Sequence, residues 1–138
     1  MNRKKILVAD DDPNILQLLE VNLKGADYDV ICCDNGETAL EKIKAEKPDL
    51  VIVDIMMPKI DGYTLDLELK DEQDTKDIPI IIITGMSDTK RLFDKTESAR
   101  FIAWFEKPLD INKLINYINE YFCKPKRPKK PQKGKKYG

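Results

Sequence analysis

Leu50–Asp54, with the sequence LVIVD, is an apolar run that ends abruptly in a carboxylate. A short continuous apolar run is typical of a strand buried on both faces of a parallel sheet. Its final aspartate would then lie at the carboxyl edge of that sheet. The same arrangement occurs earlier, where the apolar residues 6–9 lead into the acidic run 10–12. Two strands are therefore predicted to end in acids at one edge, where ligands bind in open α/β sheets.

Acidic side chains crowded at one edge of a sheet repel each other. At about 4 Å a like-charged pair costs roughly 1 kcal/mol in water, and about 4 kcal/mol at an effective dielectric of about 20. A divalent cation would relieve this repulsion, and a ligand set made only of oxygen suits Mg²⁺. The acids that end the two strands therefore favour a magnesium site.

The whole chain follows a repeating pattern of strand and helix. We expect strands over residues 6–10, 29–33, 50–54, 80–84 and 102–105. Helices are expected between them, the fourth a weak one around Asp88–Glu97, and a last helix over Ile111–Phe122 has apolar residues at clean helical spacing. Alternating strands and helices predict an α/β fold with a doubly wound parallel sheet. Right-handed crossovers then give the flavodoxin-like (βα)5 strand order 2-1-3-4-5.

Local signals predict where the first helices begin and end. Asp12 is expected to cap the first helix, with Pro13 at its first position. Gly25 is expected to stop that helix. The dipeptide Asn35-Gly36 is typical of a turn before the second helix.

Composition limits the class of protein. The chain has 138 residues, 41% of them hydrophobic, which favours one domain with a proper core. It has no run of 18 apolar residues and no secretory signal at its start, so we expect a cytoplasmic protein that is not inserted in a membrane. The three cysteines suit a reducing compartment and suggest neither a disulfide framework nor a zinc site. There is no histidine, which excludes Ser-His and Cys-His catalysis and a histidine kinase function for this chain itself.

Charge is distributed very unevenly along the chain. Residues 124–138 contain eight Lys and Arg and no acid, whereas residues 1–123 hold 16 basic and 25 acidic side chains, a formal charge of −9. We expect a folded domain over 1–123 and a basic, proline-rich, disordered tail over 124–138. The tail could contact nucleic acid through salt-dependent binding, or it could be a solvated tail or the stub of a linker to an output domain.

Polar residues that end four of the five expected strands converge on one edge of the sheet. They are Asp10, Asp11, Asp54, Thr84 and Lys107. Over about residues 4–122 the sequence closely resembles the receiver domain of two-component response regulators. The resemblance is carried by four motifs: ILVADDDP at 6–13, DIMMPKIDG at 54–62, PIIIITG at 79–85 and EKP at 106–108.

The resemblance implies a metal-assisted phosphorylation site. Asp54 would be the phosphoryl acceptor, with a phosphohistidine on a sensor histidine kinase or a histidine phosphotransfer protein as donor. Asp11 and Asp54 would bind Mg²⁺ directly, together with the backbone carbonyl of Met56. Asp10 would act through a metal-bound water.

The resemblance also implies how phosphorylation is sensed. Lys107 would pair with one phosphoryl oxygen, and the hydroxyl of Thr84 would hydrogen-bond another. Trp104 occupies the position of the family's switch aromatic, which would rotate inward as the surface of helix 4, strand 5 and helix 5 changes. Met56 and Met86 would flank the path of the attacking water; neither orients water strongly, so we expect slow self-dephosphorylation.

The chain departs from the family pattern just before the fifth strand. Arg100-Phe101 stands where the family often has a Gly-Ala pair, after an unusually polar stretch. Gly85 follows Thr84 where alanine is commoner, and Trp104 is bulkier than the usual Tyr or Phe.

Two other classes fit parts of the sequence. Asp10-x-Asp12 after a strand resembles the nucleophile motif of haloacid-dehalogenase-type phosphatases, but that family needs a later acidic pair. Beyond residue 107 only Asp110 and Glu120 remain, both expected on the last helix. A flavodoxin-like nucleotide-binding module would need a glycine-rich loop after the first strand, and none is present.

Overall fold

A computed structural model describes residues 3–55, 62–85 and 100–123. Five parallel strands form one sheet in the order β2-β1-β3-β4-β5. The strands are β1 Lys5–Ala9, β2 Asp29–Cys33, β3 Leu50–Asp54, β4 Ile80–Thr84 and β5 Phe101–Glu106. The helices are α1 Pro13–Gly25, α2 Gly36–Glu46, α3 Gly62–Leu69 and α5 Ile111–Cys123. The helix expected around Asp88–Glu97 lies outside the described residues.

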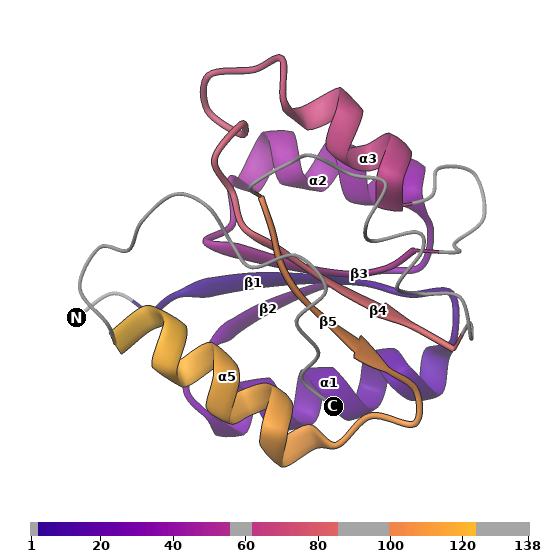
Figure 1. Cartoon of the computed structure of the whole chain (residues 1–138), viewed down its shortest axis with the longest axis vertical. Coiled ribbons are helices and arrows are strands. Elements are labelled where there is room, and N and C mark those ends of the chain that lie inside the picture. The colour runs from indigo at the N-terminus through magenta and orange to yellow at the C-terminus, as the bar shows by residue number, and fades with distance from the viewer. Residues whose placement is uncertain (1–2, 56–61, 86–99, 124–138) are drawn as a thin grey trace.

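The molecule has three layers (Figure 1). Helices α2 and α3 cover one face of the sheet, and α1 and α5 cover the other. Each face has its own apolar cluster. The α2/α3 cluster includes Leu65, Leu69 and Trp104, whereas the α1/α5 cluster includes Leu19 and Leu114. The predicted doubly wound, flavodoxin-like α/β fold is confirmed. None of the helices in the described ranges is long and apolar enough to cross a membrane.

The predicted start and the predicted end of α1 are both confirmed. The side chain of Asp12 accepts a hydrogen bond from the N–H of Asn14 at 2.9 Å and caps the helix. Gly25, expected to stop the helix, is its last helical residue. After the helix the chain turns at Asp27, whose φ is +73°. A short polar side chain tolerates this left-handed conformation better than most residues do.

The dipeptide predicted as a turn is a helix cap. Asn35 is extended, and its Oδ1 accepts a hydrogen bond from the N–H of Thr38 at 2.8 Å. Helix α2 therefore begins at Gly36, directly after the cap. The amide side chain satisfies a free N–H of the first helical turn, which is the reason Asn is favoured at this position.

Strand β5 contains one irregularity that sets its register. Phe101 pairs with Ile80, and Ala103 pairs with the next residue, Ile81. Ile102 is therefore an extra residue, as in a β-bulge.

The bulge decides which way the side chains of β5 face. Regular alternation would put residues three apart on opposite faces. Here Phe101 and Trp104 both belong to the α2/α3 cluster, while Ala103 and Phe105 belong to the α1/α5 cluster. The bulge thus allows both large rings at 101 and 104 to pack on the same side of the sheet.

Candidate functional site

Asp10 is held at the carboxyl edge of the sheet by two hydrogen bonds. Its N–H donates to the carbonyl of Cys33 at 3.0 Å, which extends the β1–β2 ladder beyond β1. Its Oδ1 accepts from the N–H of Asp12 at 2.9 Å. The side chain of Asp10 is completely buried. Local bonding to the residue two positions on is common for Asp and fixes the direction of the carboxylate.

Lys107 connects the acids that end β1 and β3. Asp54 is the last residue of β3 and is 6% exposed. The Nζ of Lys107 donates to Asp54 Oδ2 at 3.0 Å and lies 2.9 Å from Asp10 Oδ2. The backbone of Lys107 is fixed at the same edge, because its N–H donates to the carbonyl of Thr84 at 2.8 Å. Side chains from three strand ends thus meet at one point.

The contact between Lys107 and Asp10 is an ion pair without the angles of a hydrogen bond. Among the described residues, none donates a well-aligned hydrogen bond to Asp10 Oδ2. This oxygen is buried and charged, so it retains capacity for a further ligand.

The two sides of this ion pair have shifted pKa values. Burial raises the pKa of the Asp10 carboxyl, and the nearby Asp54 charge adds to the increase; the Asp12 N–H and the Lys107 ammonium oppose it without cancelling it. For Lys107, burial alone would lower the pKa, but the carboxylates of Asp10 and Asp54 outweigh burial and raise it. Lys107 is therefore held charged, while its single charge does not fully offset the burial of Asp10.

The three predicted metal ligands lie together. Asp10, Asp11 and Asp54 each offer one carboxylate oxygen, and these three oxygens lie within 4.8 Å of one another. Asp10 and Asp54 are buried and Asp11 is exposed, so the group opens to solvent on one side. The ligand atoms are all carboxylate oxygens, which fits a small hard cation. Met56, the fourth predicted ligand, lies outside the described residues.

Of the predicted sensing residues, Thr84 lies at the carboxyl edge with Lys107, and Trp104 lies in the middle of β5. Thr84 ends β4 and is completely buried. Trp104 pairs with Ile82 in the sheet and is 3% exposed, packed in the α2/α3 cluster. The indole is thus already buried in this conformation, so it has no exposed position from which to rotate inward. Met86 lies outside the described residues.

Two contacts, one at the site and one at the amino end of β5, were not predicted from the sequence. Asp12 was expected only to cap α1, but its N–H also holds Asp10; the i to i+2 spacing of the two acids is the signal for this bond. Arg100 was noted only as a departure from the family pattern. It is 5% exposed, and its Nη1 donates to the carbonyl of Thr75 at 2.6 Å. No spacing in the sequence indicates that contact.

The acids required by a phosphatase of the haloacid dehalogenase type do not reach the site. Asp110 precedes α5, and its Oδ1 accepts from the N–H of Lys113 at 3.2 Å. Glu120 lies in α5, and both acids are exposed. Neither belongs to the acidic group at the ends of β1 and β3.

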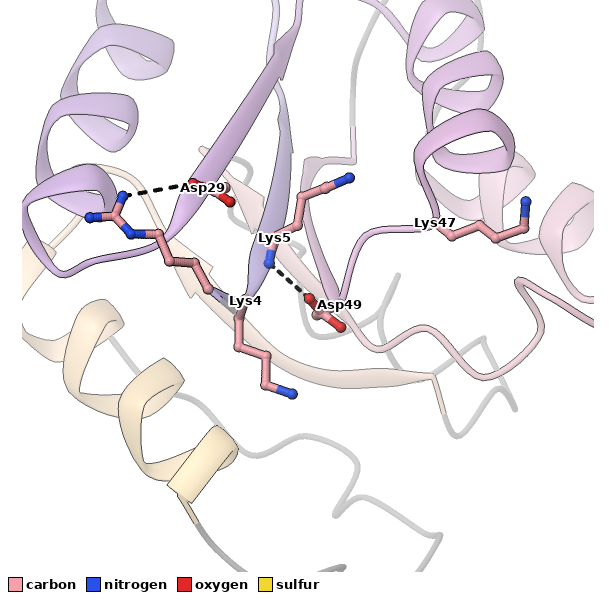
Figure 2. Close-up of a pocket in the computed structure, with 6 residues that line it drawn as sticks. Lys4, Lys5, Asp29, Lys47 and Asp49 are labelled. Carbon is pink, nitrogen blue, oxygen red and sulfur yellow. Dashed lines mark hydrogen bonds and ion pairs between the residues drawn. The ribbon is translucent and has the colours of Figure 1, made fainter. Parts of the chain in front are cut away.

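A polar pocket lies at the opposite, amino-terminal edge of the sheet (Figure 2). Its lining residues are Arg3, Lys4, Lys5, Asp29, Lys47 and Asp49. The carboxylate of Asp49 accepts from the N–H of Lys5 at 2.8 Å, and Arg3 pairs with Asp29 at 3.7 Å. Two of the other lining cations pair with acids outside the lining: Lys5 with Glu46 at 3.0 Å and Lys47 with Asp74 at 3.9 Å.

The chain is similar to transcriptional regulators. It is 44% identical over 92 residues to the alkaline phosphatase synthesis transcriptional regulatory protein PhoP of Bacillus subtilis, covering 67% of this chain and 36% of that protein. It is 33% identical over 119 residues to the DNA-binding dual master transcriptional regulator RpaA of Synechocystis, covering 80% of this chain and 46% of that protein. The chain thus spans less than half the length of these curated relatives.

Solved structures of receiver domains have the same fold. The signal receiver domain of a signal transduction histidine kinase from Syntrophus aciditrophicus is 28% identical with a TM-score of 0.76, covering 90% of this chain and 95% of that one. The receiver domain of the Francisella response regulator 1452 is 27% identical with a TM-score of 0.71, covering 87% and 97%. The sequence profile of the response regulator receiver domain matches residues 6–119. The chain therefore belongs to the family of response regulator receiver domains of two-component signalling.

Proposed function

We propose that this chain is a phosphorylation-activated signalling switch in which Asp54 accepts a phosphoryl group from a phosphohistidine. The donor would be a sensor histidine kinase or a histidine phosphotransfer protein. The observation that carries the proposal is the position of Lys107, whose Nζ is 3.0 Å from Asp54 Oδ2 and 2.9 Å from Asp10 Oδ2. A cation placed against the acceptor carboxylate is what transfer of a charged group requires.

The transfer needs no base from the protein. A carboxylate oxygen of Asp54 attacks phosphorus, the P–N bond breaks, its electron pair goes to the imidazole nitrogen, and an acyl phosphate forms. Such transfers depend on in-line placement and on neutralising the phosphoryl oxygens. Lys107, fixed by its backbone bond to Thr84, would supply one positive charge, and the Thr84 hydroxyl would donate to another phosphoryl oxygen.

Mg²⁺ is the proposed cofactor. Asp11 and Asp54 would hold it directly with the carbonyl of Met56, and Asp10 would act through a bound water. When bound, the ion would neutralise charge on the transferred group. The oxygen-only cluster of carboxylates, open to solvent at Asp11, supports this assignment.

The proposed output is a change at the surface formed by helix 4, β5 and α5. An acyl phosphate adds about −1.5 to −2 charge if it resembles other phosphoryl groups, and Thr84 would respond to it. Trp104 is already almost completely buried, with 3% of its surface exposed. Its response would therefore be a change in packing within the α2/α3 cluster. The names of the relatives favour transcriptional control as the eventual output.

The remaining assignments concern the rest of the chain. We place the receiver domain at 1–123 and a basic tail at 124–138, in a cytoplasmic protein. The eight cations of the tail could give a second, salt-dependent contact with nucleic acid. Met56 and Met86 would make self-dephosphorylation slow, because a thioether does not orient water strongly. The chain would act as a switch and not as an enzyme with an external substrate.

Intact-mass measurement tests the proposal. With acetyl phosphate and Mg²⁺ the wild type is expected to gain the mass of one HPO₃ unit on Asp54, the carboxylate at the end of β3 that accepts a hydrogen bond from Lys107. Asp54→Asn removes the nucleophile and should abolish the adduct, whereas the control Asp49→Asn, at the opposite edge of the sheet, should retain it. An adduct of undiminished yield in Asp54→Asn would refute the assignment.

A further inference from the structure

The start of β5 is held by a side chain that has no role in the proposed phosphoryl transfer. Arg100 immediately precedes β5 and is 5% exposed. Its Nη1 donates to the carbonyl of Thr75 at 2.6 Å, and its own carbonyl accepts from the N–H of Ile80 at 2.6 Å. Arg100 therefore ties the beginning of β5 both to β4 and to the connection between α3 and β4.

The anchor point of Arg100 is itself firmly held. Thr75 is completely buried, and its hydroxyl donates to the carbonyl of Leu69, the last residue of α3, at 2.8 Å. Its carbonyl also accepts from the N–H of Ile78 at 3.2 Å. The guanidinium thus binds to backbone that is tied to α3 and to the residues just before β4.

The bulge of β5 follows directly after this anchor. Ile102 is the extra residue, so it separates an upstream part held by Arg100 from a downstream part that carries Trp104 and leads to Lys107. If the bulge were lost, one part would shift by one residue, about 3.3 Å in a parallel strand. A shift upstream would break the 2.6 Å bond from Arg100 to Thr75. Once that bond is lost, the extra residue is no longer held at position 102, and the downstream part is also free to change register.

A downstream shift would damage the site in two ways. A displacement of one residue turns every side chain to the other face of the sheet, which would take Trp104 out of the α2/α3 cluster. It would also move Lys107 away from Asp54, which it now contacts at 3.0 Å. The register of β5 and the geometry of the acceptor site are therefore linked.

We propose that Arg100 is a positioning residue: by holding the carbonyl of Thr75 it locks the β5 bulge, and so places Lys107 against Asp54. The consequence for phosphorylation rests on the proposed function of Asp54. The consequence for the packing of Trp104 does not.

Three variants of the full chain test this role. Arg100→Met removes the donors but keeps a long side chain that suits a buried position. Arg100→Lys restores a cation with fewer directed donors. Thr75→Val is the matched control, because it deletes the hydroxyl bond to Leu69 and keeps the carbonyl that Arg100 uses. The readouts are the emission maximum of Trp104, the only tryptophan, without ligand, and the initial rate of phosphorylation by acetyl phosphate with Mg²⁺.

Arg100→Met is expected to shift Trp104 emission to the red and to slow phosphorylation roughly tenfold or more, since a misplacement of about 1 Å can cost up to about 100-fold. These measurements are made at a temperature where circular dichroism shows native helix content. Arg100→Lys should recover part of both losses. Thr75→Val should melt at a lower temperature yet keep the emission maximum and rate of the wild type.

Wild-type emission and rate in folded Arg100→Met would overturn the proposal, and so would equal slowing in Thr75→Val. If Arg100→Met does not fold, Arg100→Lys decides: a red shift with slower phosphorylation supports the role, and wild-type values for both overturn it. A wild type that takes up no phosphoryl group refutes the proposed function of Asp54. The emission maxima still test Arg100 in that case.

Discussion

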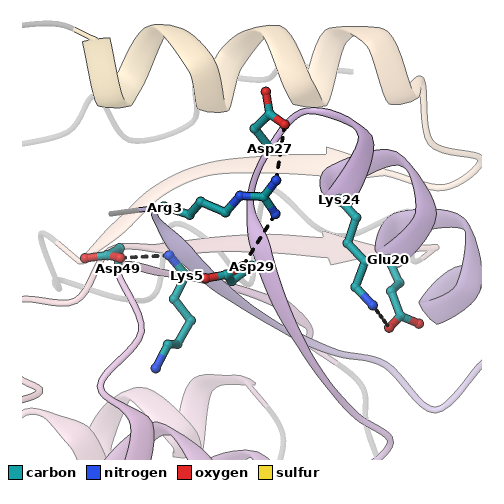
Figure 3. A network of polar contacts seen from close by, with 7 residues as sticks. All are labelled: Arg3, Lys5, Glu20, Lys24, Asp27, Asp29 and Asp49. Carbon is teal, nitrogen blue, oxygen red and sulfur yellow. Dashed lines mark hydrogen bonds and ion pairs between the residues drawn. The ribbon is translucent and has the colours of Figure 1, made fainter. Parts of the chain in front are cut away.

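The two edges of the sheet carry the same kinds of charged groups but differ in their access to water. At the amino-terminal edge, Arg3 pairs with Asp27 at 3.4 Å, and these side chains are 51% and 85% exposed (Figure 3). At the carboxyl edge, Lys107 lies 2.9 Å from Asp10, and these side chains are 22% and 0% exposed. Distance alone therefore does not distinguish a surface ion pair from a candidate site. The degree of burial does.

Burial changes what each pair contributes. Exposed pairs are screened by water and salt and are typically worth about 0.2–1 kcal/mol. Buried charges must be compensated, because an unpaired one is strongly destabilising. At the carboxyl edge, burial raises the pKa of Asp10, whereas the carboxylates of Asp10 and Asp54 raise the pKa of Lys107 against the effect of burial. The following predictions compare the two edges, from the largest expected effect to the smallest.

Removing the cation at the carboxyl edge should have the largest effect on stability. Lys107→Met leaves the carboxylates of Asp10 and Asp54 buried without their counterion, and we expect a loss of about 2 to 3 kcal/mol in the free energy of unfolding at neutral pH without metal. The matched change at the other edge, Lys5→Met, breaks the 3.0 Å pair with Glu46 and should cost less than about 1 kcal/mol. Urea unfolding of both variants measures the difference, and equal losses would contradict it.

The contribution of Lys107 also has a definite pH dependence. Its pKa is raised in the folded protein, so its stabilisation is fully present below the unfolded pKa and is lost as the pH rises through the folded pKa. The stability difference between wild type and Lys107→Met should therefore shrink at strongly alkaline pH.

Mg²⁺ should stabilise the fold through the carboxyl edge. A ligand that binds only the folded state at about thirty times its dissociation constant adds about 2 kcal/mol. We expect the melting temperature of the wild type to rise with Mg²⁺ and that of Asp11→Ala to respond much less, because Asp11 is the solvent-facing member of the acidic group. Asp29→Ala, at the amino-terminal edge, is the control and should respond like the wild type. A wild type insensitive to Mg²⁺ would argue against the three-acid site.

Neutralising the buried acid should be mildly stabilising. The pKa of Asp10 is raised by burial, so its ionised form is less favourable in the folded than in the unfolded chain. That cost is absent at low pH and develops as the pH rises through the folded pKa. Asp10→Asn should therefore gain about 1 kcal/mol at about pH 7, and the gain should vanish near about pH 4, close to the ordinary pKa of an aspartate.

The control for this prediction is Asp27→Asn at the exposed edge, which should change the free energy of unfolding by less than about 0.5 kcal/mol. Both variants are compared by urea unfolding at the two pH values without metal. A loss of stability in Asp10→Asn at neutral pH would show that its ion pair with Lys107 outweighs burial.

The smallest effect is expected for the exposed network. Arg3 bridges Asp27 and Asp29 at 3.4 and 3.7 Å. Arg3→Gln should cost less than about 0.5 kcal/mol at low salt, and that cost should disappear at about 1 M salt, where the Debye length is about 3 Å. A larger cost that persists in high salt would mean that the exposed pairs are not screened as proposed.

The strand ends and their acids were predicted from the sequence because their signals are local. The run Leu50–Asp54 is a strand as predicted, and Asp12 caps α1 as predicted. The strand order also followed from the alternation of elements. Because the carboxyl ends of parallel strands meet at one edge, the meeting of Asp10, Asp11 and Asp54 followed as well. The helix end at Gly25 was also predicted correctly. Asn35-Gly36 was predicted as a turn, but Asn35 caps α2 and Gly36 begins it, because turn and helix-cap conformations compete at such a dipeptide.

The arrangement of β5 was decided only in the tertiary structure. Residues 101–105, FIAWF, are all apolar, so no period in the sequence says which side chain faces α2 and α3. Phe101 and Trp104 pack on one face, and we propose that the bond from Arg100 to Thr75 holds the bulge between them. The contact of Lys107 with Asp10 and Asp54 depends on that register. Local patterns determine which residues end the strands, whereas the distances between those ends come from contacts among residues far apart in the chain.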